Sequence, residues 1–508
     1  MRETHLLKHS IAPLDATGVR TSSWQERGIL FLLVLLGTVL RFIALGRQPL
    51  WLDEATDAAF ARQTFWNCVF AEAVHPPLYR ALLHFIVVGF GDSAVAVRFL
   101  PALFGAFTIP AMVILARRLF PGTDLAAATL AATSPFLIFF SQENRDYSLF
   151  ILLTVLATWA FWRFCESGRG LLLYAALSIL LLYTHYLALF VLLAHEIVFW
   201  WRDRRSPRDW IFARAAVSCA VAPWLLWAAG RYHQESRMFV APALLIPGTL
   251  LRFFVGYGIA ASDAVRKAQP WRSQIISQGP AVVPAFCLFA WLLWRGACRA
   301  VARPRLTILL ACILLLPWAT LVFLAPWIKL TQDRYLAFQA PFVLLLIAAG
   351  FDSLVSRGRA IVGAMLALVI AFSLTAYYGA PGSRFGYQFQ YGKENWAGAA
   401  AFVRQEHPDV VILAPGYLYL PLDRYPMQPL REIRTIAGVF SPPEIHNARG
   451  VALILSHAGP AEERLRTALD ATYPQIAHAT FPAQNLIRVI VYDTSSSLPR
   501  VDNAQALK

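Results

Sequence analysis

The feature that most constrains this chain is a series of long apolar runs separated by short, arginine-rich stretches. A membrane-spanning helix needs about 20 predominantly apolar residues, and about eleven runs approach that length. Only 15% of the 508 residues are charged, whereas soluble proteins average roughly 25%. The pattern predicts a polytopic α-helical membrane protein and disfavours a soluble enzyme, a coiled coil or a disordered chain. The expected spans are 28–46, 95–116, 123–140, 147–163, 171–186, 187–201, 210–229, 281–298, 306–326, 335–351 and 360–378.

The arginine-rich stretches predict how the spans are oriented. Cytoplasmic loops of membrane proteins are enriched in Arg and Lys, and the basic clusters share one side only if the apolar run 77–91 does not span. That run is short for a span and contains Arg80 and His84, so we expect a helix that lies in the membrane interface. Residues 47–93 then form one long external loop with interfacial helices, and the tail 1–26 is cytoplasmic.

The net charge of +15 by itself allows a nucleic acid, an anionic membrane surface or a polyanionic substrate as partner. On the expected topology, most of the arginines are cytoplasmic orientation signals that contact anionic membrane lipids. We therefore expect no nucleic-acid partner. The first apolar run has no small-residue cleavage site after it, which favours a retained first span over a removed signal peptide.

Beyond about residue 380 the apolar runs give way to short strands that alternate with helices, which is typical of an α/β domain. We expect a transmembrane domain over 27–380, a small C-terminal α/β domain over 385–495 and a disordered tail over 496–508. An odd number of spans places the α/β domain on the external, periplasmic side. Its expected elements are helices 396–405 and 461–469 and strands 410–414, 451–456 and 487–492.

Signatures of metals and nucleotides are missing from the sequence. The six cysteines form no C-x-x-C pair and lie mostly in apolar runs, so neither a disulfide framework nor a zinc site is indicated. No phosphate-binding glycine loop precedes a helix, which disfavours a nucleotide-driven pump. Asp53, Glu54 and Asp146 form the only acidic cluster suited to a cation, without a supporting histidine spacing. We expect no metal and no cofactor.

Polar residues that belong at membrane depth gather on the external side of this topology. Such residues are costly there and are functional candidates by default. An arginine fork can bind a phosphate at two points, and a carboxylate can take a proton from an attacking hydroxyl. The combination favours a reaction on a lipid-linked anionic substrate. The segments concerned are Trp51–Asp57, Glu72–Pro77, Ser141–Tyr147, Thr184–Tyr186 and Lys329–Tyr335.

Taken in order, these segments resemble those of the membrane glycosyltransferases with the GT-C fold. The resemblance is to the branch of protein O-mannosyltransferases and bacterial aminoarabinose transferases, which is glycosyltransferase family 39-like. It runs from about residue 28 to about residue 415, and the order and spacing of its pieces are more specific than any single piece. The pieces are Leu50–Ala55, His75–Tyr79, Ser141–Tyr147, Thr184–Tyr186, Asp333–Leu336 and Lys393–Ala400.

The resemblance implies transfer of a sugar from a polyprenyl-phosphate donor, with inversion, at the external face of a bacterial inner membrane. It makes Asp53 the base that activates the acceptor and Glu54 a second catalytic acid that orients Asp53 or contacts the sugar. The donor phosphate and lipid would meet Arg145, Tyr147, Arg334 and Tyr335, and the substrate would meet His75, Asp146 and His185. Tyr147 departs from the family pattern, because many relatives carry an acid at that place, and Asp146 is the candidate substitute.

Each of these residues also has a purely structural explanation. Asp53 suits a helix cap, Arg145 and Arg334 suit the ends of spans, His75 lies in a rigid proline turn, and His185 suits an interface anchor. Two other functions stay open: a lipid-linked saccharide transporter or flippase without chemistry, and a cell-surface glycan ligase or polymerase. A transporter would carry its charges along a midplane cavity, whereas these charges crowd the outer rim. The sugar and the acceptor, a hydroxyl or amine on a lipid, glycan or protein, are not indicated.

Overall fold

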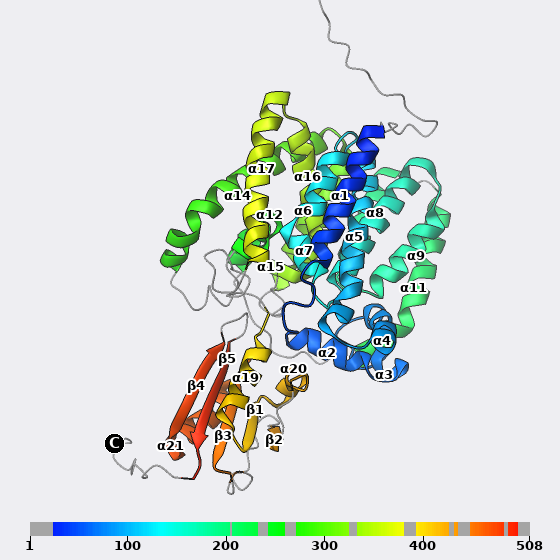
Figure 1. Cartoon of the computed structure of the whole chain (residues 1–508). Helices are drawn as coiled ribbons and strands as arrows, with labels where there is room; N and C mark the ends of the chain where they lie inside the picture. Colours follow the sequence, from blue (N-terminus) through cyan, green and yellow to red (C-terminus); the bar gives the residue numbers. More distant parts are fainter. Residues whose placement is uncertain are drawn as a thin grey trace, which may run out of the picture.

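The computed structural model describes residues 24–203, 206–231, 242–259, 271–324, 333–379, 393–425, 431–434, 445, 448–481 and 486–495. Figure 1 shows a bundle of helices with a small domain of strands and helices below it. We call the end of the bundle that faces this domain the outer end. Most of the tail expected over 1–26 and all of the tail expected over 496–508 lie outside the described residues.

Each of the eleven segments expected to span is helical in the structure. Within the described residues, seven helices have the length and apolar composition of a membrane span, and the pair α6 and α7, which is bent by 54°, would make an eighth. The helix α1 carries three charged residues, and α9 and α10 are shorter than a span, so the number eleven stays a prediction. The helices are α1 (Trp24–Phe42), α5 (Ala94–Leu119), α6 (Asp124–Thr133), α7 (Pro135–Ser141), α8 (Tyr147–Ser167), α9 (Leu171–Leu182), α10 (Ala188–Val198), α11 (Pro207–Ala229), α14 (Trp271–Val301), α15 (Pro304–Leu324), α16 (Ala340–Asp352) and α17 (Ser356–Tyr378).

The loop between α1 and α5 contains three short helices, α2 (Leu52–Ala61), α3 (Phe65–Val69) and α4 (Leu78–Phe90). All three gather at the outer end of the bundle (Figure 1). The helix α4, which covers the apolar run 77–91, has 13 residues and packs against α2, α3 and α5. A helix of this length is too short to cross a hydrocarbon core of about 30 Å. This agrees with the expectation that the run 77–91 does not span.

A further apolar helix, α12 (Pro242–Ile259), lies between the expected spans 210–229 and 281–298, where no helix was predicted. It packs against α7, α14 and α17 and is bent at Gly256, whose φ is +66°. A Cβ atom at Gly256 would lie 2.7 Å from Cβ of Pro135 in α7, so both the backbone angle and the close approach require glycine. The helix brings Arg252 and Tyr257 to the outer end of the bundle.

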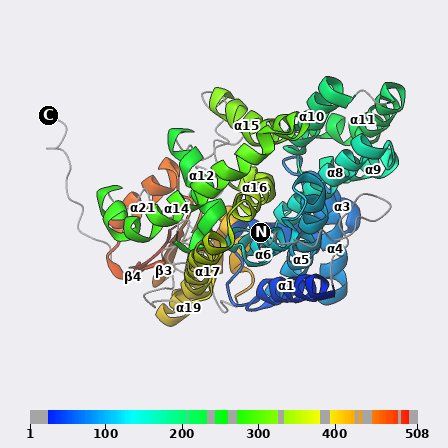
Figure 2. The same cartoon turned by 90° about the horizontal axis from the view of Figure 1, so that it is seen from above.

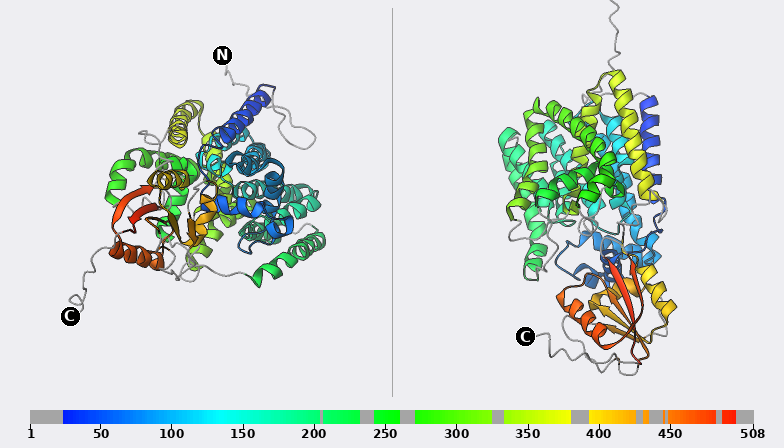
Figure 3. Two further views of the ribbon diagram at one scale, coloured as in Figure 1. Left: turned by 60° about the horizontal axis from the view of Figure 1, so that its bottom comes forward. Right: turned by 90° about the vertical axis from the view of Figure 1, so that its left-hand side faces the viewer.

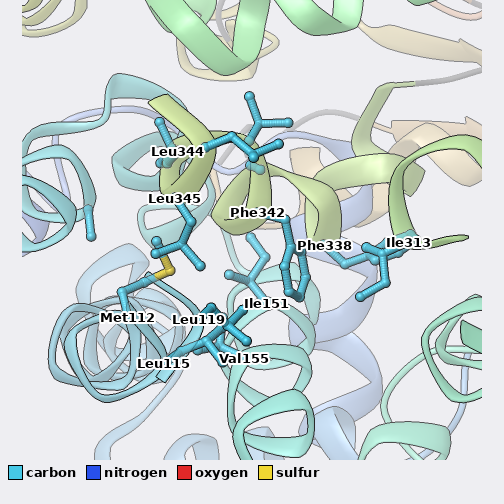
Figure 4. Close-up of a cluster of buried hydrophobic side chains, with 14 of the residues drawn as sticks. Met112, Leu115, Leu119, Ile151, Val155, Ile313, Phe338, Phe342, Leu344 and Leu345 are labelled. Carbon is cyan, nitrogen blue, oxygen red and sulfur yellow. The ribbon is translucent and has the colours of Figure 1, made fainter. Parts of the chain in front are cut away.

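The core of the bundle lies between α5, α8 and α16. Figure 4 shows Met112, Leu115 and Leu119 of α5 facing Ile151 and Val155 of α8, with Phe342 and Leu345 of α16 closing the cluster. Looking along the bundle, Figure 2 shows α16 near its middle, with α9 and α11 at one side and α14 at the other. The helices α14 and α16 approach closely because a Cβ atom at Gly296 or Gly350 would collide with backbone of the facing helix. Close contact through small residues is typical of helix packing in membranes.

The C-terminal part is a five-stranded mixed sheet in the order β2-β1-β3-β5-β4. The strands β2, β1 and β3 are parallel, and β5 and β4 are antiparallel to their neighbours. Its hydrophobic clusters place α19 on one face and α21 on the other, as the two views in Figure 3 show. The elements are α19 (Trp396–Glu406), β1 (Val410–Ala414), α20 (Tyr419–Leu422), β2 (Arg431–Arg434), β3 (Gly450–Leu455), α21 (Pro460–Thr472), β4 (Gln475–Phe481) and β5 (Ile487–Asp493).

The three strands expected from sequence are confirmed as β1, β3 and β5, and the two expected helices as α19 and α21. The strands β2 and β4 were not predicted. The sequence of β2 is Arg-Glu-Ile-Arg, which carries no apolar run, and β4 is an edge strand that is largely exposed. Strands at the edges of a sheet bury little surface, so their composition is a weak signal. The predicted fold class, a polytopic helical membrane protein with a small α/β domain, is confirmed.

Candidate active site

The helix α2 sets the two acids of the first loop on different sides. Its N-cap residue, Trp51, has no side-chain acceptor, but the Oε2 atom of Glu54 accepts a hydrogen bond of 3.4 Å from the Trp51 N–H. This is the half of a capping box that the third helical residue supplies. Successive helical residues point about 100° apart. Glu54 therefore faces α5, while Asp53 faces the 3-10 helix η2 (Asp333–Gln339).

The carboxylate of Glu54 is completely buried and holds several elements together. Arg98 of α5 donates to both of its oxygens, at 2.8 and 2.7 Å. The Oε1 atom also accepts from the Asn144 backbone N–H and from Lys393 Nζ, each at 2.7 Å. Burial opposes ionisation, but Arg98 and Lys393 lower the pKa of Glu54 to about 2. These contacts favour a role in holding the site together over a role in proton transfer.

The carboxylate of Asp53 is instead partly open, with 29% of the side chain exposed. Its Oδ2 atom accepts a hydrogen bond of 2.9 Å from Nη1 of Arg334. Although burial opposes ionisation, the charges of Arg334 and Arg145 lower the pKa of Asp53 below its usual value. The Arg334 guanidinium lies over the rings of Trp51 and Tyr335, 5.6 and 5.7 Å from their centres. The structure thus presents an ionised, accessible carboxylate beside a fixed arginine.

Arg145 lies in a second chain of contacts that begins in α2. Its Nη1 atom is 2.7 Å from Oδ2 of Asp57, and its Nη2 atom is 2.8 Å from Nε2 of His75. Because a guanidinium only donates, His75 accepts through Nε2 and keeps its proton on Nδ1, which lies 2.8 Å from Oε1 of Glu72. The carboxylate of Glu72 also pairs with Arg80 at 3.2 Å. The His75 ring, with its single proton on Nδ1, therefore orients the Arg145 guanidinium.

Several residues in this region retain buried polar atoms without a hydrogen-bond partner among the described residues. These atoms include both carboxylate oxygens of Asp146, Oε2 of Glu143, and the Nε atoms of Arg145 and Arg334. A buried polar group without a partner costs roughly 1–3 kcal/mol. Burial and the nearby Glu54 raise the pKa of Glu143 to about 7 in spite of the charge on Lys393. Unused donors and acceptors of this kind favour a site that a polar ligand completes.

Aromatic residues form one wall of the same region. Tyr147, the first residue of α8, is 1% exposed and lies 6.1 Å from His185 between ring centres. The His185 ring stacks on Phe150 at 4.6 Å and lies 6.5 Å from Tyr335. The Nδ1 atom of His185 accepts from the Leu187 N–H at 3.1 Å, which leaves Nε2 as its protonated nitrogen. The expected site residues from five separate segments are thus brought to one end of the bundle.

Several residues of this site were not selected from the sequence. Asp57, Glu72 and Glu143 lie in the polar segments named above but had no role assigned to them. Arg98, which lies inside an expected apolar span, and Lys393, which begins the last piece of the resemblance, supply further contacts. Lys393 comes 339 residues after its partner Glu54, and nothing local in the sequence relates the two. Among the residues that the structure describes, no three His, Cys, Asp or Glu side chains come together as a metal site would require.

Comparison with known proteins agrees with this architecture. A family model for dolichyl-phosphate-mannose-protein mannosyltransferases matches residues 74–227, which include His75, Arg145 and His185. A search of curated protein sequences found no match.

Among solved structures, the chain is similar to ArnT from Cupriavidus metallidurans in the apo state. The TM-score is 0.57 at 14% identity, covering 93% of this chain and 99% of that chain. The same protein bound to undecaprenyl phosphate gives a TM-score of 0.53 at 16% identity over the same shares. The apo oligosaccharyltransferase from Archaeoglobus fulgidus gives 0.51 at 12% identity, over 80% of this chain and 64% of that chain.

The likeness to the two ArnT structures extends over 93% of the chain. Identities this low establish a common fold and leave the chemistry to be argued from the site. The chain is a multi-pass membrane protein with the GT-C fold of membrane glycosyltransferases, similar to the branch of protein O-mannosyltransferases and aminoarabinose transferases.

Proposed function

We propose that this protein transfers a sugar from a polyprenyl-phosphate donor to an acceptor hydroxyl or amine at the outer end of the bundle. The observation that carries the proposal is the ionised, partly exposed Asp53 carboxylate, held beside Arg334 and near the charge of Arg145. A base and two phosphate-binding cations in one place are what such a transfer needs. The solved ArnT structure with undecaprenyl phosphate shows that a protein of this fold binds a polyprenyl phosphate.

In the proposed reaction the acceptor oxygen or nitrogen gives its proton to Asp53 and attacks the anomeric carbon of the donor. The bond between that carbon and the phosphate oxygen breaks from the opposite face, so the anomeric configuration inverts. Arg145 and Arg334 stabilise the charge that develops on the departing polyprenyl phosphate. A low pKa keeps Asp53 ionised at neutral pH, which is the form that accepts a proton.

We assign the other residues by their contacts. His75, held by Glu72, orients Arg145, and Tyr147 and Tyr335 flank the donor phosphate. The unpartnered carboxylate of Asp146 accepts hydrogen bonds from sugar hydroxyls, with His185 beside it. Glu54 acts by holding α2 in place, because all of its contacts are to protein groups and its side chain is buried. No step of this scheme requires a metal or cofactor.

We place the protein in a bacterial inner membrane, with the outer end and the α/β domain on the periplasmic side. The support is the path of the chain. Arg117 and Arg118 lie in the last turn of α5, and Arg303 donates to the carbonyl oxygen of Leu119 at the end of that helix. The helix α5 runs away from the α/β domain, so these arginines belong to the opposite end (Figure 1). Arginine-rich loops face the cytoplasm.

The test is a transfer assay with the purified full chain in lipid vesicles that contain a polyprenyl-phosphate sugar and a candidate acceptor. The donor is chosen from the mass of the lipid-linked sugar that accumulates in cells from which the protein is deleted. Sugar appearing on the acceptor with inverted configuration supports the proposal.

A transporter gives a different result in sealed vesicles. A fluorescent lipid-linked sugar would then cross the bilayer without any product forming, and the glycosyltransferase proposal would be wrong. A glycan ligase or polymerase would form product only with a growing glycan as acceptor, which the choice of acceptors in the assay distinguishes.

A further inference from the structure

The α/β domain touches the helix that carries Asp53 through its first described residues, Lys393 and Glu394. The Nζ atom of Lys393 lies 2.7 Å from Oε1 of Glu54 and 2.8 Å from the carbonyl oxygen of Gln142. Its side chain is 5% exposed, so the ammonium group is enclosed by these partners. Burial lowers the pKa of Lys393 to about 8. Lys393 thus connects α2 to the segment between α7 and α8, which contains Arg145.

Glu394 reaches the first residue of α2. Its buried carboxylate accepts the Leu52 backbone N–H at 3.1 Å through Oε2. The first N–H groups of a helix have no partner within the helix, and a carboxylate at this end is also favoured by the helix dipole. An acid from another domain therefore caps α2 one residue before Asp53.

The same carboxylate is anchored in the α/β domain. Its Oε2 atom accepts the Trp396 Nε1–H at 2.7 Å, and its Oε1 atom lies 2.6 Å from Nε2 of His457, which follows β3. The Trp396 ring is fully buried in the cluster beneath α19. The cap on α2 is accordingly held by the packed core of the domain.

A third contact fixes the far end of α2 to the same domain. Arg424, after α20, donates to Oδ2 of Asp92 at 2.6 Å, and Asp92 also pairs with Arg62 at the C-cap of α2. The helix α2 also packs directly against α20. Both ends of the helix that carries Asp53 are therefore linked to the α/β domain, while Arg98 of α5 holds Glu54 in its first turn.

We propose that Lys393 and Glu394 are positioning residues that set the Asp53 carboxylate from the α/β domain, so that this domain takes part in the transfer reaction. The proposal rests on the function proposed above for Asp53. It differs from the two simpler roles for the domain, which are to bind the acceptor or to stabilise the outer end. Misplacing a reacting group by about 1 Å costs on the order of 100-fold in rate, so small shifts of α2 are measurable.

The experiment compares Glu394→Ala, Glu394→Gln and the control Glu463→Gln in the full-length protein. Glu463 is an acid of the same domain that pairs with Arg466 and Arg488 at the surface of α21. We expect Glu394→Ala to lower kcat by about 10- to 100-fold with unchanged affinity for polyprenyl phosphate. Glu394→Gln keeps an acceptor oxygen for the Leu52 N–H and should restore most of kcat. The control should behave as wild type.

A second measurement does not depend on activity. Hydrogen–deuterium exchange of residues 50–58 should be faster in Glu394→Ala than in wild type and unchanged in Glu463→Gln, because the Leu52 N–H loses its partner. If the wild-type protein transfers no sugar, the proposed function fails, but this exchange result still decides whether Glu394 positions α2.

Three results would overturn the inference. They are a kcat of Glu394→Ala within twofold of wild type, a loss confined to KM for the acceptor, and unchanged exchange in residues 50–58. If Glu394→Ala does not give a folded protein that binds polyprenyl phosphate, Lys393→Met decides the matter. The variant Lys393→Met removes the contact between Lys393 and Glu54 but keeps the contact between Arg98 and Glu54, and it should lower kcat about 10-fold. A wild-type kcat in that variant would contradict the proposal.

Discussion

Two polar clusters occupy opposite ends of the bundle, and they are built differently. The cluster at the outer end contains Asp53, Asp57, Arg145 and Arg334, and several of its buried atoms have no partner among the described residues. The opposite end is called the inner end, and its cluster the inner cluster. The inner cluster joins α9, α10 and α11 and consists of Tyr174, His195, Glu196, Trp210 and Arg214.

Among the described residues, the polar atoms of the inner cluster are paired mainly with other protein groups; Oε1 of Glu196 makes no hydrogen bond but forms an ion pair with Arg214. His195 is bonded on both sides, to the Tyr174 hydroxyl at 3.1 Å and to Thr158 at 3.2 Å. Glu196 pairs with Arg214 at 2.5 Å and accepts from Trp210 at 2.9 Å. Charged groups in a membrane protein must be paired, and here pairing alone explains them.

The difference teaches that burial and charge by themselves do not mark a functional site. The two clusters differ in how completely their polar atoms are paired. The outer cluster has several buried donors and acceptors without a hydrogen-bond partner among the described residues, and they lie beside an accessible carboxylate. Substitutions of the same chemical kind should therefore affect transfer at the outer end and stability at the inner end. The four predictions that follow run from the largest expected effect to the smallest.

The largest effect should come from Asp53→Asn. This variant keeps the shape of the side chain but cannot accept a proton, so kcat should fall by roughly 1,000-fold. Binding of polyprenyl phosphate should persist, which a titration with the labelled lipid measures. Asp124→Asn, which removes a similar acid paired with Arg117 at the other end, is the control. Normal turnover in Asp53→Asn would show that Asp53 is not the base that accepts the proton of the acceptor.

Arg145→Lys should weaken donor binding. Lysine keeps the charge but cannot contact Asp57, His75 and a phosphate through one planar fork, so we expect the Kd for polyprenyl phosphate to rise about 10- to 100-fold. The same titration measures it, with Arg117→Lys as the matched control. An unchanged Kd in Arg145→Lys would mean that the donor phosphate binds elsewhere.

Glu143→Gln should change the pH dependence of stability. The folded-state pKa of Glu143 is raised to about 7 by burial and by Glu54, although Lys393, Arg334 and Arg145 oppose the shift. Its protonated form therefore stabilises the fold below the ordinary pKa of about 4.5, and that stabilisation is lost as the pH rises through about 7.

Melting curves between pH 5 and 7.5 test this prediction. The Tm of the wild type relative to Glu143→Gln should fall by about 2 °C or more over this range. Parallel curves for the two proteins would show that Glu143 does not titrate there.

The smallest effect on transfer should come from Glu196→Gln. This change breaks the pair with Arg214 and should lower the free energy of unfolding by about 1 kcal/mol, with kcat within about twofold of wild type. Asp57→Asn is the matched change at the outer end and should lower transfer by at least 10-fold, because Arg145 loses the partner that orients it. Equal effects of the two changes on kcat would abolish the distinction between the clusters.

The sequence by itself determined the class of fold and the regions that matter. Apolar runs of span length predict helices wherever they occur, since the lipid environment leaves the backbone no other way to satisfy its hydrogen bonds. The strands β1, β3 and β5 were predictable because they are buried in the sheet and consist largely of apolar residues. The order of the polar segments pointed to Asp53, Arg145 and Arg334, which the structure brings to one end of the bundle.

Only the tertiary structure decided the roles within that cluster. Asp53 and Glu54 are adjacent acids, and nothing local shows that Glu54 is buried by Arg98, 44 residues away, and by Lys393, 339 residues away. The helix α12 was missed because its position depends on packing against α7, α14 and α17. The link from Glu394 to Leu52 joins two domains. Contacts between residues distant in the chain depend on how the helices pack, and this information is spread over the whole sequence.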